Sequence, residues 1–537
     1  MACGEAFDKR FQPGSMLGQV MNRLLDRPGL VFALVFCWKV ALLAFTVQPI
    51  PANDSYFYDG PVVHLLNQGG YFNPSIALAR PISGTEFFSA YPPGYQLALL
   101  AWMAIFGTSA LSACWFHLVL FGGYLLVLLA IFRHFAVPAR YGNLAGLFLF
   151  AITFHDRPDS LAFLLGSLAI YASARAQGPR KNSGSDSGSN PWAWLATGFV
   201  ILTLSTSLQI GSVYFACVIL STALAWKILH RPFPTLPLAA MFLTPMALIA
   251  LVYFGFPRLW AGFIENVHNN PSLTGLRMPA LVDSLKLGRN APGVIVMAGL
   301  VLLNLQRWRN VARIEACGSR EITLGTGLVM ALMVMAGCLS IVTPNWISAA
   351  MYLQPLLVGL FLSSLASLSA GRVRPAVITG LVVLPACLAA IRAVGMSTWG
   401  LACAADVSYG AAIERVRSDL RAPPTGHKAM VSSAYLYEAD RSTNGVWIHE
   451  AYPMPPGSAE TYAESLRKLR VDKLVLTQFD FYRRYQQVLA ELRAQGGVKI
   501  DIVDMARVRP PDSFPRLRQV LQHISWAPVL VTLTWNY

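Results

Sequence analysis

The chain has 537 residues, of which 55% are hydrophobic and only 13% are charged, and its mean hydropathy is +0.49. Since soluble domains carry about 25% charged residues, this composition argues against an ordinary soluble protein and predicts a polytopic membrane protein. The net charge of +15 would suggest nucleic acid in a soluble protein, but much of it lies in short loops between apolar runs, where it is a topology signal, and we predict no nucleic-acid partner.

Residues 1–28 carry four basic side chains and are predicted to form a cytoplasmic N-terminus. The first apolar run, near 29–48, is too long for the apolar part of a signal peptide, so we expect it to be an uncleaved membrane anchor. A long polar loop, 49–93, follows. The later apolar runs lie near 94–107, 109–131, 141–154, 159–174, 193–207, 209–227, 235–256, 292–306, 322–341, 349–369 and 375–395.

The basic loops 132–140 and 175–192 are expected to be cytoplasmic, which puts the intervening hairpin tip 155–159 and the loop 49–93 outside. The chain must then cross the membrane an odd number of times between residues 93 and 132. The run 94–107 is only about 21 Å long as a helix, short of the roughly 30 Å hydrocarbon core. We therefore predict a re-entrant or interfacial helix there, and about 11 transmembrane helices with the C-terminus outside.

The transmembrane domain is predicted to span 29–395, and residues 396–537 to form a small extracytoplasmic α/β soluble domain. That domain alternates strand-like and helix-like segments. The predicted strands are 472–477, 498–503 and 529–534, and the predicted helices are 459–470, 480–495 and 513–523.

The eight cysteines lie mostly inside apolar segments, and none forms a CxxC or Cys/His spacing typical of a metal site. We predict no metal and no other cofactor. His117, within an apolar run, is predicted to be an interior histidine with satisfied nitrogens rather than a ligand.

Asp54 lies a few residues beyond the first apolar run, on the polar loop. A carboxylate held there could accept a proton from an acceptor hydroxyl, while fixed cations stabilise a phosphate leaving group. Asp54 could instead cap a helix that begins near Ser55. Asp59 is five residues further on, so on a shared helix it would point roughly 140° away from Asp54.

Four segments in this order resemble the GT-C superfamily of integral-membrane glycosyltransferases: Asp54–Gly69, Ser89–Tyr95, Phe106–Leu111 and Arg157–Asp159. The resemblance is nearest to the bacterial branch related to protein O-mannosyltransferases and to the aminoarabinose transferase of lipid A, and it covers about residues 29–230. It implies a GT-C fold, a polyprenyl-phosphate sugar donor, inverting transfer and a first-loop aspartate as the base.

By the family pattern, Asp54 takes the role of the base. Family members often carry a Glu directly after this aspartate, where this chain has Ser55. Asp159 matches a second acidic position and is our second catalytic candidate, although it could equally cap a helix that starts at Ser160. A late Arg-Tyr pair of the family is matched only by Met351-Tyr352. The predicted substrate-binding residues are Tyr58, Asp59, Arg157, Lys286, Arg289 and Tyr352, of which Lys286 and Arg289 are the candidate phosphate contacts.

The sequence thus predicts a membrane glycosyltransferase of the bacterial inner membrane that works on the non-cytoplasmic face. Its acceptor could be a glycan, a lipid or a protein, and its donor would reach it through the lipid bilayer. The alternatives are a transporter or flippase for a lipid-linked glycan, which should show internal repeats, and a non-catalytic membrane scaffold.

Overall fold

The computed structural model describes residues 26–51 (without 49), 58–71, 76–77, 93–151, 159–176, 375–421, 428–442, 447–449, 459–508 and 524–536, with residues 358–359, residue 521 and isolated positions between 193 and 261. The helices of the N-terminal part are α3 (Leu30–Thr46), α5 (Gly60–Gln68), α6 (Gly94–Phe106), α7 (Ala110–His134), α8 (Ala139–Gly146), the 3-10 helix η1 (Leu147–Ala151) and α9 (Asp159–Ala176). Those of the C-terminal part are α19 (Pro375–Asp406), α20 (Tyr409–Leu420), η3 (Ser433–Tyr435), α21 (Leu436–Ser442), α22 (Ala459–Leu469), α23 (Gln478–Asp480), the π-helix η4 (Phe481–Tyr485) and α24 (Gln486–Gln495).

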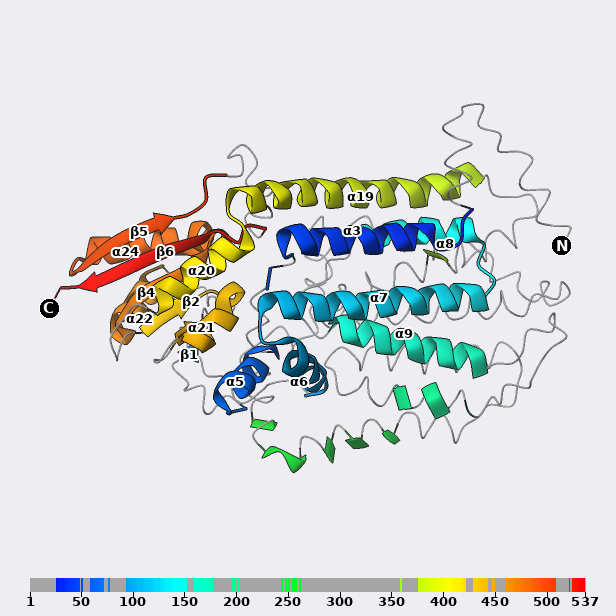
Figure 1. Cartoon of the computed structure of the whole chain (residues 1–537), viewed down its shortest axis with the longest axis horizontal. Coiled ribbons are helices and arrows are strands. Elements are labelled where there is room, and N and C mark those ends of the chain that lie inside the picture. The colour runs from blue at the N-terminus through cyan, green and yellow to red at the C-terminus, as the bar shows by residue number, and fades with distance from the viewer. Residues whose placement is uncertain are drawn as a thin grey trace, which may run out of the picture.

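Four long helices, α3, α7, α9 and α19, run side by side and form a bundle (Figure 1). Among the described residues, α7 is long and apolar enough to cross a membrane by itself, and α3, α6 and Ser160–Ala172 of α9 are shorter apolar helices. The predicted apolar runs that fall in the described part of the chain are helical. The predicted count of about 11 spans depends largely on residues outside the described ones and stays a prediction.

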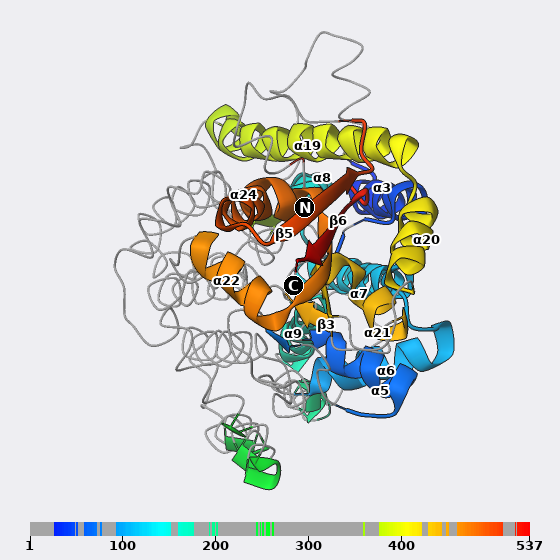
Figure 2. The same ribbon diagram turned by 90° about the vertical axis from the view of Figure 1, so that its left-hand side faces the viewer.

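Helix α6 coincides with the run predicted to be re-entrant or interfacial. The views in Figures 1 and 2 show α6 running across the direction of α7 rather than along the bundle. The turn between the two helices passes through Gly107, whose φ of 85° lies in the left-handed region that glycine enters at little cost. Ser109 then caps α7 by accepting a hydrogen bond from the backbone N–H of Ser112 at 3.1 Å.

The run predicted as a span at 141–154 differs in form, because α8 ends at Gly146 and continues as the 3-10 helix η1. Asn143 on α8 accepts a hydrogen bond from the backbone N–H of Val31 at 3.2 Å and donates to the carbonyl of Arg27 at 2.7 Å. This buried amide therefore satisfies backbone groups at the start of α3, where a helix leaves its first N–H groups unpaired.

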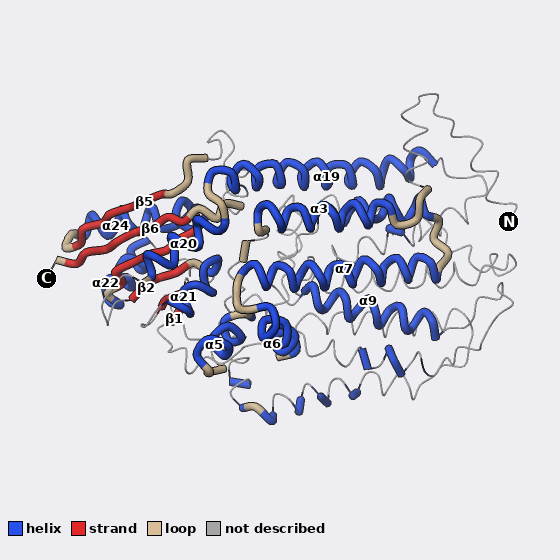
Figure 3. The backbone as a smooth tube through the Cα atoms, in the orientation of Figure 1, coloured by secondary structure: helices blue, strands red, loops and turns tan. Residues whose placement is uncertain are grey.

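The C-terminal part contains a mixed sheet with strand order β1-β3-β2-β4-β6-β5. Its inner strands β2 and β4 are parallel, while β6 runs antiparallel to β4 and β5. The predicted strands at 472–477, 498–503 and 529–534 correspond to β4, β5 and β6 (Figure 3). The strands are β1 (Ile76–Ala77), β2 (Lys428–Val431), β3 (Trp447–His449), β4 (Val471–Thr477), β5 (Val498–Asp504) and β6 (Pro528–Trp535).

Strand β1 comes from the first polar loop, yet it pairs in parallel with β3 of the C-terminal part. Trp526 reinforces this junction, because its indole N–H donates to the carbonyl of Val47 at 3.0 Å, just after α3. Gln48 donates to the carbonyl of Ile524 at 2.9 Å. Helix α5 and strand β1 of the first loop thus lie at the same end of the helical bundle as the sheet (Figure 1).

The predicted boundary between residues 395 and 396 lies inside α19, which continues without a break to Asp406. The continuous helix leads from the bundle directly to α20 and the sheet (Figure 1).

Candidate functional site

A buried carboxylate, Asp59, lies at the start of α5, where the first loop meets the C-terminal part of the chain. Its side chain is completely buried. One carboxylate oxygen accepts a hydrogen bond from the hydroxyl of Tyr95 on α6 at 3.0 Å, and the other accepts from the hydroxyl of Tyr437 on α21 at 2.7 Å. Asp59 thus joins three segments that are far apart in the sequence.

The hydrogen bonds continue from Tyr95 into the bundle. The Tyr95 hydroxyl oxygen lies 3.0 Å from Nε2 of His117 on α7, and Nδ1 of His117 lies 2.7 Å from the hydroxyl of Ser160 on α9. Since Tyr95 donates its proton to Asp59, its oxygen acts as the acceptor toward His117, which assigns the Nε2–H tautomer to the ring. Nδ1 of His117 then accepts from the hydroxyl of Ser160, so each hydrogen bond of this network is donated in the direction of Asp59.

Burial raises the pKa of Asp59 from 3.8 to about 7, because the charged carboxylate has lost its water. The hydrogen bonds from Tyr437 and Tyr95 act in the opposite direction and lower the pKa, since they stabilise the ionised form. A carboxyl group with a pKa near neutrality changes charge within the physiological pH range.

Aromatic rings surround this network and keep water out. Tyr58, which precedes Asp59, is 3% exposed and packs edge-on against Tyr95 with 5.9 Å between ring centroids. Phe116 approaches Tyr95 from another side at 6.1 Å, and the His117 ring stacks on Tyr95 at 5.9 Å. Rings at these separations interact favourably beyond the area they bury, so they hold the Tyr95 hydroxyl in place.

A second carboxylate fastens α21 to α5. Asp440 accepts hydrogen bonds from Nδ1 of His64 and from the side-chain amide of Asn67, both at 2.8 Å. Asn67 accepts a hydrogen bond from the Thr108 hydroxyl at 3.0 Å, and Arg441 donates to that same hydroxyl oxygen. This cluster, the α5–α21 clasp, links the first loop, the α6–α7 turn and the C-terminal part.

A third buried carboxylate, Glu438, lies two residues before Asp440 on α21, the helix that carries Tyr437. One of its oxygens accepts from Arg417 at 3.1 Å, and the other is buried without a hydrogen-bond partner among the described residues. Burial raises the pKa of Glu438, and the charge and hydrogen bond of Arg417 partly offset this rise.

Arg417 also lines a cavity of about 690 Å³ between the start of α7 and α20. Tyr409 and Arg421 line the same cavity. The two arginines and Glu414 give this cavity a charged lining of both signs.

The structure brings together some of the predicted site residues and does not describe others. Tyr58 and Asp59 are both buried in the network. Asp159 is the first residue of α9, directly before Ser160 of the network, and its side chain is outside the described part. The predicted residues outside the described ones are Asp54, Arg157, Lys286, Arg289 and Tyr352.

Tyr437 and Ser160 belong to no motif that would mark them as functional in the sequence, and Tyr95 is marked only as the last residue of the segment Ser89–Tyr95. His117 is buried with a hydrogen-bond partner at each ring nitrogen, which confirms the predicted interior histidine. A polar ring within an apolar run needs buried partners. That requirement was the one signal in the sequence for this network.

No family model and no curated protein matches the chain. The solved structures that are similar to it include three at low identity. ArnT from Cupriavidus metallidurans bound to undecaprenyl phosphate shares 11% identity over 94% of this chain and 98% of its own, with a TM-score of 0.49. The same protein in the apo state shares 13% identity over 93% and 97%, with a TM-score of 0.44.

The third structure is the Archaeoglobus fulgidus oligosaccharyltransferase tethered to an acceptor peptide with the NVT sequon. It shares 12% identity over 86% of this chain and 71% of its own, with a TM-score of 0.46. At these identities and TM-scores the likeness carries no argument, and the function of this chain has to be argued from its own residues.

Proposed function

We propose that the chain is an inverting membrane glycosyltransferase that transfers a sugar from a polyprenyl-phosphate donor to an acceptor glycan, lipid or protein on the non-cytoplasmic face. The observation that carries the proposal is the hydrogen-bonded network from Asp59 to Ser160. Asp59 follows Asp54 by five residues and Ser160 directly follows Asp159. The network therefore supports a site at which both predicted acidic segments meet, at the bundle end that also carries the C-terminal sheet.

In the proposed reaction, Asp54 accepts the proton of an acceptor hydroxyl as its oxygen attacks the anomeric carbon of the donor sugar. The bond between that carbon and the phosphate oxygen breaks, and its electron pair leaves with the polyprenyl phosphate. Attack opposite the leaving group inverts the anomeric centre. Arg157, Lys286 and Arg289, together with Tyr352, are the proposed contacts to the donor and its phosphate, where negative charge develops.

Asp59 is a positioning residue in this proposal rather than the base. Its side chain is completely buried and both of its oxygens already accept hydrogen bonds. An acceptor hydroxyl cannot reach a carboxylate that rings and tyrosine hydroxyls enclose. What Asp59 can do is fix the start of α5, and with it the preceding segment that carries Asp54, against α6 and α21.

A transfer assay in detergent separates this proposal from a transporter, because an enzyme forms its product without a sealed membrane. Purified protein is given lipid-linked sugar donors together with extracted envelope acceptors, and the products are identified by mass spectrometry. Sugar-modified acceptor from the wild-type protein supports the proposal. A protein that changes envelope glycans in cells but forms no product with any donor and acceptor extract in detergent contradicts it.

A further inference from the structure

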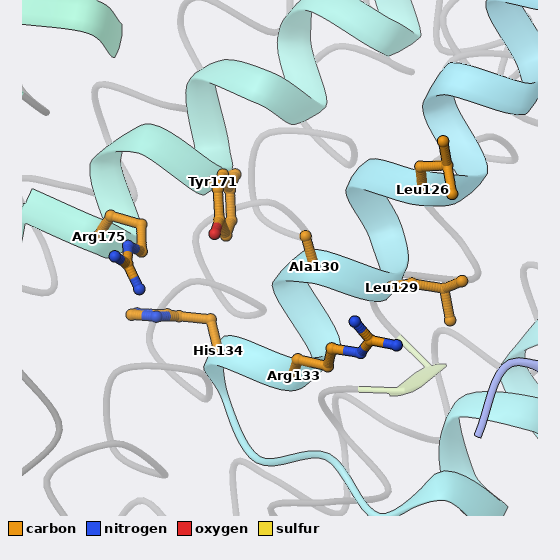
Figure 4. Close-up of a pocket in the computed structure, with 7 residues that line it drawn as sticks. All are labelled: Leu126, Leu129, Ala130, Arg133, His134, Tyr171 and Arg175. Carbon is orange, nitrogen blue, oxygen red and sulfur yellow. The ribbon is translucent and has the colours of Figure 1, made fainter. Parts of the chain in front are cut away.

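A second cavity, of about 350 Å³, lies between α7 and α9 at the bundle end opposite the sheet. Its polar wall consists of Arg133 and His134 from the last turn of α7 and of Tyr171 and Arg175 from α9. Figure 4 shows the His134 ring and the Arg175 side chain pointing toward each other beside Tyr171. This cavity takes no part in the network around Asp59.

The charged side chains of the polar wall are all basic. None of the residues that line the cavity is acidic, while three are basic. Cations in the last turn of a helix are favoured by its dipole, and basic loops orient membrane proteins. These effects explain why such residues stand at helix ends, but neither requires residues of two different helices to line one cavity. A bound anion would explain why basic residues of both helices line this cavity, since guanidinium groups form charge-assisted hydrogen bonds to phosphate.

The other wall of the cavity is apolar and belongs to α7. Leu126, Leu129 and Ala130 form it. Leu126 is 69% exposed on a helix that is long and apolar enough to cross a membrane. The side of α7 that continues from the cavity therefore suits a hydrocarbon chain, so the occupant must combine an anionic head with an apolar tail.

We propose that this cavity binds one anionic phospholipid, with its phosphate against His134 and Arg175 and an acyl chain along Leu126 and Leu129. The Arg133 side chain points the other way in Figure 4 and adds to the positive charge at this end of α7. A lipid fits better than free phosphate because only the lipid uses the apolar wall. Basic pockets between membrane helices hold anionic headgroups in this way. The lipid belongs to the leaflet at which loops 132–140 and 175–192 emerge, which the charge pattern predicts to be cytoplasmic.

Native mass spectrometry of the full chain, purified in detergent and titrated with phosphatidylglycerol or phosphatidylcholine, tests the proposal. We expect one tightly held phosphatidylglycerol and no comparable phosphatidylcholine. The double variant Arg133→Gln/Arg175→Gln should bind phosphatidylglycerol at least about tenfold more weakly, because it loses the charge-assisted contact of Arg175 and the positive charge of Arg133. The single variant Arg175→Gln should show a smaller loss in the same direction.

A charge-matched control is the double variant Arg27→Gln/Arg140→Gln, which removes two cations of the same bundle end that do not line the cavity. It should bind phosphatidylglycerol like the wild type. Equal weakening in both double variants, or no preference of the wild type for phosphatidylglycerol, overturns the proposal. Displacement of the lipid by millimolar inorganic phosphate overturns it as well, since the cavity would then bind phosphate alone. If the double variant fails to fold, the wild-type lipid preference, the phosphate competition and the single variant still decide.

Discussion

At the scale of single residues, the buried carboxyl group of Asp59 controls how the junction responds to pH. Its pKa is raised from 3.8 to about 7 by burial. The native state therefore holds a proton that the unfolded chain releases, and the stability falls as the pH rises between these two values. Below a pH of about 4 the carboxyl group is protonated in both the native and the unfolded state, and this loss of stability vanishes. Above a pH of about 7 the whole loss applies.

The variant Asp59→Asn should lose this pH dependence. The raised pKa corresponds to a difference on the order of 4 kcal/mol in the free energy of unfolding between the two ends of the range. Thermal unfolding of the purified protein between pH 4.5 and 8 measures it. The stability of the wild type should fall more steeply with rising pH than that of Asp59→Asn. Asp501→Asn, at an exposed site paired with Lys499, should show the same pH dependence of stability as the wild type. Equal slopes for Asp59→Asn and wild type would contradict the assignment.

Tyr437→Phe removes one of the two hydrogen bonds to Asp59 and keeps the ring. Because this bond lowers the pKa of Asp59, its loss should raise that pKa further. The stability should then keep falling to a higher pH than in the wild type. The same unfolding series reads out this shift, and a shift toward lower pH would show that Tyr437 does not stabilise the ionised carboxylate.

At the scale of elements, the short helices α5 and α21 join the first loop to the C-terminal part of the chain. Neither is stable by itself, since isolated helices of seven to nine residues are marginal in water. Their order comes from the α5–α21 clasp around Asp440 and from the Asp59–Tyr437 hydrogen bond. We infer that they become ordered together.

Asp440→Ala should loosen α5 and α21 while leaving the sheet intact. The change removes the Asp440 acceptor from the half-buried side chains of His64 and Asn67, which should cost about 1 kcal/mol for each lost hydrogen bond. Hydrogen exchange should accelerate in residues 60–68 and 436–442 and stay unchanged in β4 and β6. Asp501→Ala, which breaks only the exposed pair with Lys499, should change neither. Uniformly faster exchange across the sheet would show that the clasp stabilises more of the protein than α5 and α21.

At the scale of the whole molecule, local sequence patterns predicted the helices and strands well, but they did not predict which elements distant in the sequence contact one another. The alternation in 472–477 and the apolar run of 109–131 each reflect one element's own periodicity, and both elements are present as β4 and α7. The pairing of Ile76 with Ile448 and the hydrogen bond from Tyr437 to Asp59 join positions more than three hundred residues apart. No local pattern encodes such partners.

The same contrast between local patterns and long-range contacts applies to the candidate site. The motif resemblance pointed to the segment around Asp54 and to Asp159, and the network runs through the neighbouring residues Asp59 and Ser160. Burial is what the sequence did not predict, because Asp59 was predicted as an accessible substrate contact and its side chain is completely buried. Exposure depends on how α6 and α21 pack around it, which the order of residues in one loop does not determine.

The arrangement of the two bundle ends also predicts a topology. A cysteine at Gly70 in the first loop and one at Asp501 in β5 should react with a membrane-impermeant thiol reagent from the same side. A cysteine at Arg140, at the opposite end of the bundle, should react only after the membrane is opened. Labelling of Gly70→Cys and Arg140→Cys from the same side would contradict the predicted topology.

The most direct test of the central claim compares the transfer activity of Asp54→Asn and Asp501→Asn in detergent. Asparagine keeps the shape of the side chain but cannot accept the proton, so Asp54→Asn should lower the transfer rate by about 10² to 10⁴-fold. Asp501→Asn should retain the wild-type rate. Undiminished transfer by Asp54→Asn, in protein that unfolds at the wild-type temperature, would contradict a base at Asp54 and with it the proposed mechanism.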